Sequence, residues 1–281
     1  MGSQQVRQPI SAGTLRRELS ERNRLRAATL EHEVTYGEVP SVLYAEAENG
    51  ASHGNFLDAS YRRICADPGW RRRLEKVYTA SRRVARQHDR RRSELDCANS
   101  SDALLMNVFC YPGVTSRPGV CRLLGIEPGL RPSFGVRAHV RLASGGCDRT
   151  EVDMELGEYL VEAKLTETGF QQARAALVER YRDFAEVFEI DALPRTAMAG
   201  YAEYQLLRGV LAAHARGQRF LMLCDGRRGT MAESWFRVMQ AVRGWEMRDR
   251  LRLLTWQELS AELPGVLRGF LLEKYGITAS S

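Results

Sequence analysis

The sequence predicts an α/β protein in which helices flank a mixed central sheet, with a helical, basic segment at the N-terminal end. Three observations lead to this prediction. Residues 150–165 have the pattern of a β-hairpin, residues 220–224 form a continuous apolar run, and segments of helical periodicity surround both. Such an apolar run suits a central strand that is covered on both faces. We place the N-terminal segment at 1–95, and the α/β core with its C-terminal helical cover at 96–281.

The hairpin is predicted to turn at Gly157-Glu158. Two segments with alternating apolar residues, 150–156 and 159–165, flank this pair. Glycine followed by any residue suits a two-residue type II′ turn. The turn sets the register of the two strands, so the apolar residues fall on one face and the charged residues on the other.

The charged face of the hairpin carries an arrangement that folding alone does not explain. Counting outward from the turn places Asp153 opposite Glu162, and Glu151 opposite Lys164. Directly opposed like charges destabilise a sheet. A divalent cation would explain them, because Mg²⁺ takes carboxylate oxygens together with water and substrate phosphate. Lys164 lies on the same strand face as Glu162, where it could hold a water or a phosphate. The alternative is an exposed face with mixed charges.

These residues carry a family resemblance. Asp153, followed on the next strand by Glu162-Ala163-Lys164, resembles the Asp…(Asp/Glu)-x-Lys signature of the PD-(D/E)xK, or restriction-endonuclease-like, nucleases. Val152 stands where that family often has proline. The resemblance implies a restriction-endonuclease-like core and Mg²⁺-dependent hydrolysis of phosphodiester bonds, in DNA, with Mn²⁺ as a substitute. Asp153, Glu162 and the Ala163 carbonyl would hold the metal. Lys164 would orient the attacking water.

The resemblance covers about the last two-thirds of the chain and suggests further site residues. A helix before the sheet often donates one more acidic residue in this family. The candidates are Asp102 and, second, Glu94. For Asp102 the alternative is a favourable charge in the first turn of a helix predicted over 99–111. Gln205 is an accessory candidate, because several branches of the family carry Gln or Tyr near the site.

Basic residues are concentrated in a helix predicted over 68–95. Between residues 71 and 92, ten positive side chains stand against two negative ones, a net charge of +8 on a chain of +6. Such a face repels itself unless an anion neutralises it, so we expect nucleic-acid contact; the alternative is a solvated helix face. The candidate nucleic-acid contacts are Arg82, Arg83, Arg86 and Arg90 on this helix, Arg137 and Arg141 on a predicted strand, and Arg227 and Arg228 in a glycine loop.

The remaining pattern supplies helices and one more strand. Thr230-x-x-Glu233 predicts a capping box for a helix that extends to Val242. The other helices are predicted over 14–33, 118–125, 169–190, 198–215 and 257–275, with a break at Pro264. Strands are predicted over 134–142 and 251–256.

Composition bounds the class of protein. Apolar residues make up 44% of the 281 residues and charged residues 27%, which suits a soluble globular protein, and we expect neither a secretory signal nor a membrane span. The six cysteines include no Cys-x-x-Cys pair, so we expect a reducing cytoplasm rather than zinc ribbons. A pI of about 9.1 favours a polyanionic partner. A non-catalytic nucleic-acid-binding protein and an RNA-cleaving nuclease stay open, as does the oligomeric state, a homodimer included.

Overall fold

The structure is a computed structural model that describes residues 9–35, 39–77 and 93–280. The chain divides into two compact units. The first holds residues 1–12 and 136–255, and the second holds residues 13–135 and 256–281. The predicted boundary between residues 95 and 96 therefore falls inside the second unit. None of the described helices combines the length and the apolar character needed to cross a lipid bilayer.

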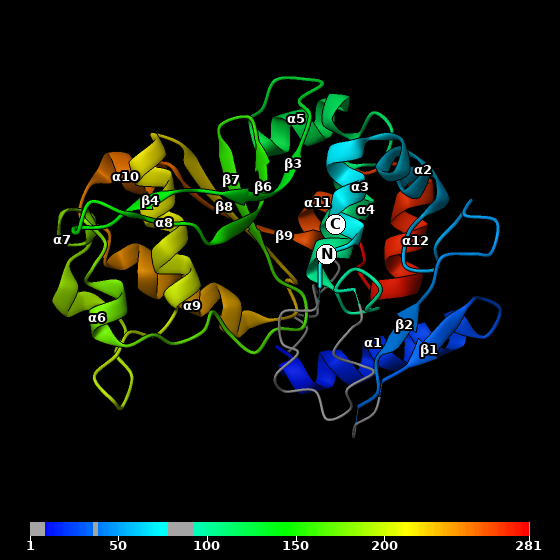
Figure 1. Ribbon diagram of the computed structural model, residues 1–281, viewed down its shortest axis with the longest axis horizontal. Coiled ribbons are helices and arrows are strands. Elements are labelled where there is room, and N and C mark those ends of the chain that lie inside the picture. The colour runs from blue at the N-terminus through cyan, green and yellow to red at the C-terminus, as the bar shows by residue number, and fades with distance from the viewer. Residues whose placement is uncertain (1–8, 36–38, 78–92, 281) are drawn as a thin grey trace, which may run out of the picture. The chain divides into compact units, whose positions relative to one another are not determined.

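A five-stranded mixed sheet organises the first unit, with the strand order β3-β6-β7-β8-β9 (Figure 1). β6 and β7 are antiparallel, whereas β7, β8 and β9 are parallel to one another. The five strands are β3 (Ser133–Arg137), β6 (Glu151–Leu156), β7 (Tyr159–Ala163), β8 (Arg219–Cys224) and β9 (Leu251–Thr255). This sheet and its flanking helices confirm the predicted α/β fold with a restriction-endonuclease-like core.

The β6–β7 hairpin has the predicted turn, and its observed pairing has the predicted register from Met154 to Leu156. Leu156 pairs with Tyr159, and Met154 pairs with Val161. Gly157 has a φ of 57°, and Glu158 is not among the residues with positive φ. A type II′ turn needs a positive φ at its first central residue alone, and glycine adopts that conformation at no steric cost.

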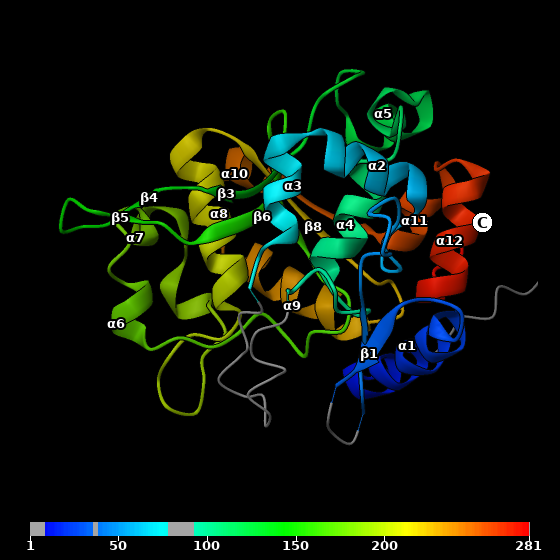
Figure 2. The same ribbon diagram turned by 45° about the vertical axis from the view of Figure 1, so that its right-hand side comes forward.

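Two helices of the first unit cover one face of the sheet, α8 (Tyr204–Arg216) and α9 (Gly229–Gln240) (Figures 1 and 2). The Phe220 ring of β8 stacks on Trp235 of α9, with 5.9 Å between ring centroids. Gly209 of α8 lies so close to the same ring that a Cβ atom there would overlap it. The predicted strand at 220–224 and the helix after it are confirmed. The capping box is wrong, because the helix begins at Gly229 and Arg228 occupies its N-cap.

The helix predicted over 169–190 is wrong. The structure has three short helices instead: α6 (Ala175–Val178), α7 (Phe184–Val187) and a 3₁₀ helix (Ile190–Ala192). Between α6 and α7 the backbone pairs with another segment of the chain. Ala143 donates its N–H to the Arg180 carbonyl, and Arg182 donates to the Arg141 carbonyl. This pairing uses backbone groups that a continuous helix would need for itself.

The strand predicted over 134–142 is divided. Only β3 joins the central sheet. β4 (Val140–Arg141) and β5 (Cys147–Asp148) form a separate two-stranded hairpin beside α7 (Figure 2). The break falls at His139, whose φ of 55° is left-handed and cannot continue a strand.

The second unit is mainly helical. Its described elements are α1 (Ala12–Ala27), β1 (His32–Val34), β2 (Val42–Tyr44), α2 (Asp58–Ala66), α3 (Pro68–Leu74), α4 (Ser101–Phe109), a 3₁₀ helix (Val114–Ser116), α5 (Pro118–Leu124), α11 (Trp256–Ala261) and α12 (Gly265–Tyr275), while α10 (Trp245–Asp249) belongs to the first unit. The helices predicted over 99–111, 118–125 and 257–275 are confirmed. The Ser100 hydroxyl caps α4 by accepting from the Ala103 N–H.

The basic helix predicted over 68–95 is wrong as one continuous element. α3 ends at Leu74, and Val77 forms an antiparallel bridge with Ser93. A straight helix would hold those two residues about 24 Å apart along its axis. Residues 78–92, and with them the candidate contacts Arg82, Arg83, Arg86 and Arg90, lie outside the described residues.

Candidate active site

Asp153 and Glu162 lie at the open end of the β6–β7 hairpin. The Asp153 Oδ2 atom accepts a hydrogen bond of 2.8 Å from the backbone N–H of Ala163, which ties this carboxylate to the neighbouring strand. Asp153 is half-buried, whereas Glu162 is buried. Of the candidate metal ligands, Asp153 and Ala163 are thus in direct contact, and Glu162 precedes Ala163 on the same strand.

Lys164 is buried beside these carboxylates. Its ammonium group donates to Glu162 Oε1 at 2.5 Å. Burial alone lowers the pKa of Lys164, but the carboxylates of Glu162, Asp153 and Glu167 outweigh burial and hold that pKa above its usual value. Lys164 is therefore a cation at neutral pH. It can donate hydrogen bonds and stabilise negative charge, but it cannot accept a proton.

The contacts of Lys164 and Ala163 offset the repulsion that we expect between two opposed carboxylates. Glu162 has a cation at hydrogen-bond distance, and Asp153 has a backbone donor. A buried carboxylate is tolerated when it is paired and hydrogen-bonded. The hairpin can thus keep both carboxylates in its folded state before any ligand binds.

Sequence reasoning missed Glu167, a third carboxylate of this region. Its Oε2 atom accepts from the Leu165 N–H at 2.6 Å, and its charge acts on Lys164. The Lys164 ammonium also lies 5.9 Å from the centroid of the Phe170 ring. The Phe170 carbonyl accepts from the backbone N–H of Gln205 at 2.9 Å. The first turn of α8, with the candidate accessory residue Gln205, therefore lies beside the segment that follows β7.

The loop after β8 is held by its own charged residues. Arg227 donates to both carboxylate oxygens of Asp225, at 2.9 and 2.6 Å. Arg228 is buried and donates to the Glu167 carbonyl at 2.9 Å. The Arg228 contact joins the segments that follow β7 and β8. That Arg227 and Arg228 also contact nucleic acid stays a prediction.

The candidate acids from the N-terminal half, Asp102 and Glu94, belong to the second unit. The Asp102 Oδ2 atom lies 2.9 Å from Arg73 and 2.7 Å from Lys76. Burial raises the pKa of Asp102, but these two cations outweigh it and hold that pKa below its usual value. Glu94 lies 3.1 Å from Lys76. Asp102 thus has an ion-pair role within its own unit, and its role as a metal ligand stays a prediction.

The donor set of the hairpin fits a small hard cation. In the part of the chain that the structure describes, no three His, Cys, Asp or Glu side chains are grouped so that they could hold a metal. Mg²⁺ does not require such a group, because one or two carboxylates plus waters and substrate phosphate suffice. Asp153 and Glu162 supply that number on adjacent strands.

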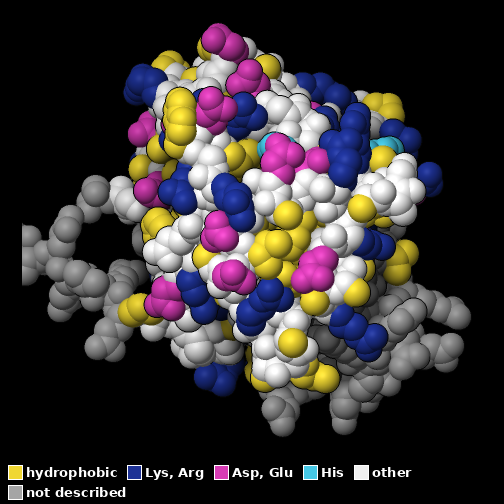
Figure 3. Space-filling view, turned by 90° about the vertical axis from the view of Figure 1, so that its left-hand side faces the viewer, with side chains coloured by type: hydrophobic (Ala, Val, Ile, Leu, Met, Phe, Trp, Pro, Cys, Tyr) yellow, Lys and Arg dark blue, Asp and Glu magenta, His cyan; other side chains and the backbone are white. Residues whose placement is uncertain are grey.

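Two of the described candidate nucleic-acid contacts are exposed. Arg137 and Arg141 are exposed, at the end of β3 and on β4. On the face of the molecule in Figure 3, positive and negative side chains are interspersed. The described residues of that face therefore present no surface of a single charge.

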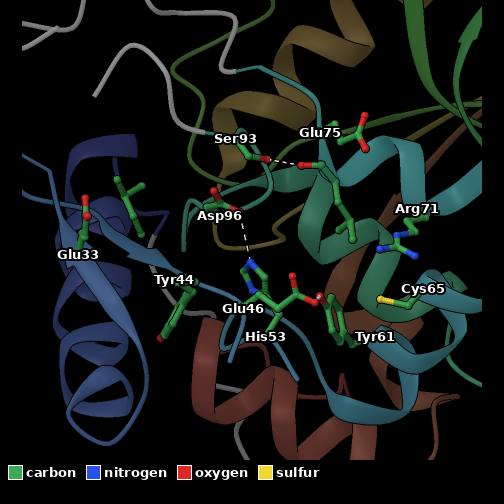
Figure 4. A pocket seen from close by; sticks show the side chains of 13 residues that line it. Glu33, Tyr44, Glu46, His53, Tyr61, Cys65, Arg71, Glu75, Ser93 and Asp96 are labelled. Carbon is green, nitrogen blue, oxygen red and sulfur yellow. Dashed lines mark hydrogen bonds and ion pairs between the residues drawn. The ribbon is translucent and has the colours of Figure 1, made fainter. Parts of the chain in front are cut away.

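The second unit contains a pocket of about 720 Å³, a volume typical of small-molecule sites. Its central polar side chains point toward one another (Figure 4). His53 accepts from the Asn55 N–H through Nδ1 at 3.1 Å and donates through Nε2 to Asp96 at 3.2 Å. Tyr61 donates to Glu46 at 2.8 Å. Because both ring nitrogens of His53 are occupied, the pocket offers no available imidazole base, and the hairpin remains the stronger candidate site.

The fold and the hairpin site define a restriction-endonuclease-like protein. A family model described as "Restriction Endonuclease associating with ARP" matches residues 23–276, and the chain belongs to this family. Membership implies a nuclease-type protein that interacts with nucleic acid. No curated protein and no solved structure matches the chain.

Proposed function

We propose that this protein is a metal-dependent nuclease of the PD-(D/E)xK type that hydrolyses phosphodiester bonds in DNA. The observation that carries the proposal is the set formed by Asp153, Glu162 and Lys164 at one end of the β6–β7 hairpin. Family membership supports the same reaction class. Asp153, Glu162 and the Ala163 carbonyl would hold Mg²⁺, for which Mn²⁺ could substitute.

The choice of lysine at position 164 supports a chemical role. The chain has 41 lysine and arginine residues, of which only Lys76, Lys164 and Lys274 are lysines. Arginine is thus the ordinary basic residue of this sequence. A lysine ammonium is a compact point charge with three donors, whereas the guanidinium is a planar fork. Beside Glu162, the three donors of the compact group could serve the carboxylate, a water and a phosphate oxygen.

Each side chain has a role that its contacts support. A bound Mg²⁺ would lower the pKa of a water molecule and neutralise charge on the phosphate. Lys164 orients the attacking water and donates to the phosphate oxygens, whose charge increases in the transition state. As an ammonium group it makes charge-assisted hydrogen bonds. Glu162 holds the ammonium at 2.5 Å, which fixes the direction of those donors.

The test compares four variants with the wild-type protein. Asp153→Asn, Glu162→Gln and Lys164→Met change the proposed site, and Glu155→Gln is the matched control. Glu155 lies on the same strand as Asp153 and has its own ion pair with Arg216 at 2.6 Å. Cleavage of circular DNA, linear DNA and RNA is measured with Mg²⁺, Mn²⁺ and EDTA, and the melting temperature of each variant is recorded.

We expect metal-dependent cleavage of DNA by the wild type and by Glu155→Gln. The three site variants should lose cleavage by a factor on the order of 100 or more, as is usual when a group that stabilises transition-state charge is removed. Cleavage by folded Asp153→Asn or Lys164→Met at the wild-type rate would refute the assignment. Binding of DNA without cleavage by the wild type would leave a nucleic-acid-binding protein instead.

A further inference from the structure

Arg208 of α8 is a buried cation with few partners. It is 7% exposed. Its guanidinium donates to the Glu151 carbonyl at 3.1 Å and lies 5.8 Å from the centroid of the Tyr204 ring. Among the described residues, no carboxylate lies within ion-pair distance of it. A guanidinium has five N–H donors, so most of its donor capacity is open to another acceptor.

Asp148 is a carboxylate that feels the charge of Arg208 from a longer distance. Burial raises the pKa of Asp148, but hydrogen bonds from Thr150 and Tyr181 outweigh burial and hold that pKa below its usual value, with a smaller contribution from Arg208. Asp148 is already used by other donors. It accepts from the Thr150 N–H at 2.7 Å and from the Tyr181 hydroxyl at 2.5 Å, and it lies 3.5 Å from Arg180. Asp148 therefore does not neutralise Arg208 directly. A buried charge without a direct counter-ion is costly, and an anionic ligand would remove that cost.

α8 carries Arg208 to the active end of the hairpin. Arg216, at the other end of the helix, pairs with Glu155 of β6, while Arg208 contacts Glu151. Eight helical residues span about 12 Å, and four strand residues span about 13 Å. α8 therefore runs along β6 in the same direction, and Arg208 lies level with the first residue of β6.

This end of β6 is also close to Lys164. Asp153, two residues after the Glu151 that Arg208 contacts, accepts from the backbone N–H of Ala163, the residue next to Lys164. The first two backbone N–H groups of α8 already have carbonyl partners, so Arg208 rather than the start of this helix would bind an anion. Tyr204 donates to the Gln171 carbonyl and Gln205 to the Phe170 carbonyl.

We infer that Arg208 is a phosphate-binding residue of the site, which takes the phosphate oxygens of a nucleic-acid strand beside Lys164. The inference rests on the proposed function for its substrate class. Two cations would then contact the same strand, Lys164 as a point charge and Arg208 as a planar fork suited to two phosphate oxygens.

The experiment measures anion binding without cleavage. Wild type, Arg208→Met and Arg208→Lys are compared in EDTA, with Arg216→Met as the matched control from the same helix. Melting temperatures are recorded in phosphate and in chloride at equal ionic strength. Affinity for a DNA oligonucleotide is measured over a range of salt concentrations. Cleavage with Mg²⁺ is assayed separately.

We expect phosphate to raise the melting temperature of the wild type and of Arg216→Met, but not of Arg208→Met. Oligonucleotide affinity should fall about tenfold to a hundredfold in Arg208→Met, which is the loss of one charge-assisted contact. The slope of log affinity against log salt should become shallower by about 0.7 to 0.9. Arg208→Lys should keep part of both effects.

The possible failures are distinguishable. An Arg208→Met protein that binds phosphate and DNA as the wild type does overturns the inference, and so does an equal loss in Arg216→Met. A wild type without any phosphate effect also overturns it. If Arg208-dependent phosphate binding is present but metal-dependent cleavage is absent, the anion site stands and the proposed nuclease function fails. If Arg208→Met does not fold, Arg208→Lys takes its place. A partial loss of phosphate stabilisation and of DNA affinity is then expected, and no loss of either overturns the inference.

Discussion

Lys164 and Lys274 show that the pKa of a buried lysine depends on the charges around it. Lys164 is surrounded by carboxylates, and its pKa is raised. Lys274 is fully buried in the second unit, where its side-chain nitrogen donates to the Ala98 carbonyl at 3.0 Å and lies 4.3 Å from the Tyr275 ring centroid. No described carboxylate lies within ion-pair distance of Lys274, and burial lowers its pKa well below the usual value.

We predict that Lys274→Met stabilises the protein at neutral pH by about 1–4 kcal/mol, as replacement of other buried ionic groups does. The unfolded lysine binds a proton that the folded lysine resists, so wild-type stability rises with pH until the unfolded pKa of 10.5 is reached. The advantage of the variant should therefore shrink between pH 7 and pH 10.5. Urea unfolding at several pH values measures it.

The hydrogen bond from Lys274 to the Ala98 carbonyl should reverse the order of stability at high pH. Near pH 10.5 the folded amine still donates to the Ala98 carbonyl, whereas methionine cannot. The variant should then be less stable than the wild type by about 1 kcal/mol. An advantage that does not change with pH would show that Lys274 carries its proton equally in both states.

At the scale of elements, the packing of α8 on β8 depends on Gly209. Alanine in a helix interior is normally better than glycine by about 1 kcal/mol. Here the new Cβ would overlap the Phe220 ring, which Trp235 holds from α9. Overpacking of a core costs about 1–3 kcal/mol. We predict that Gly209→Ala lowers the free energy of unfolding and, by displacing the helix that carries Arg208, also lowers activity.

Gly269 of α12 is the matched control for this prediction. A Cβ atom at Gly269 meets nothing within 4 Å, so Gly269→Ala should stabilise by about 0.5–1 kcal/mol. Thermal melting of both variants gives the comparison. Stabilisation in both proteins would mean that α8 can move away from Phe220 without loss.

At the scale of the whole molecule, the second unit is built from two segments that are far apart in the sequence. Residues 256–281 belong to the unit of residues 13–135. Asn23 of α1 donates to the Lys274 carbonyl at 3.1 Å, and Arg26 pairs with Glu273 at 2.6 Å. Leu267, Leu271 and Tyr275 of α12 are fully buried. The last helices thus complete the core of the second unit.

We predict that a protein ending at Thr255 loses the structure of the second unit, because α1 and α4 would expose the apolar surface that α11 and α12 cover. Limited proteolysis followed by mass spectrometry should give cuts within residues 13–135 that the full chain resists. Protection of that segment at the level of the full chain would show that the second unit folds without α11 and α12.

The sequence by itself determined the features that local chemistry controls. The glycine turn and the alternation of residues 150–165 set the hairpin register from Met154 to Leu156, and the charged residues that follow on both strands were read from the same pattern. The apolar run 220–224 identified the buried strand, and the pattern of residues 99–111 identified α4. Each of these signals lies within a few residues of the structure that it specifies, so no distant contact had to be known.

Tertiary structure decided the rest. β7 is a central strand because β8 pairs with it from sixty residues away, with Leu160 opposite Phe220, and all of its residues are buried. The helix predicted over 169–190 is replaced by short pieces because its backbone pairs with residues 141–143. Arg208 could not be assigned to the site from its helical pattern, since its place there depends on how α8 lies along β6. Pairing and packing between distant segments compete with local preference, and their free energy is not encoded in any short window of sequence.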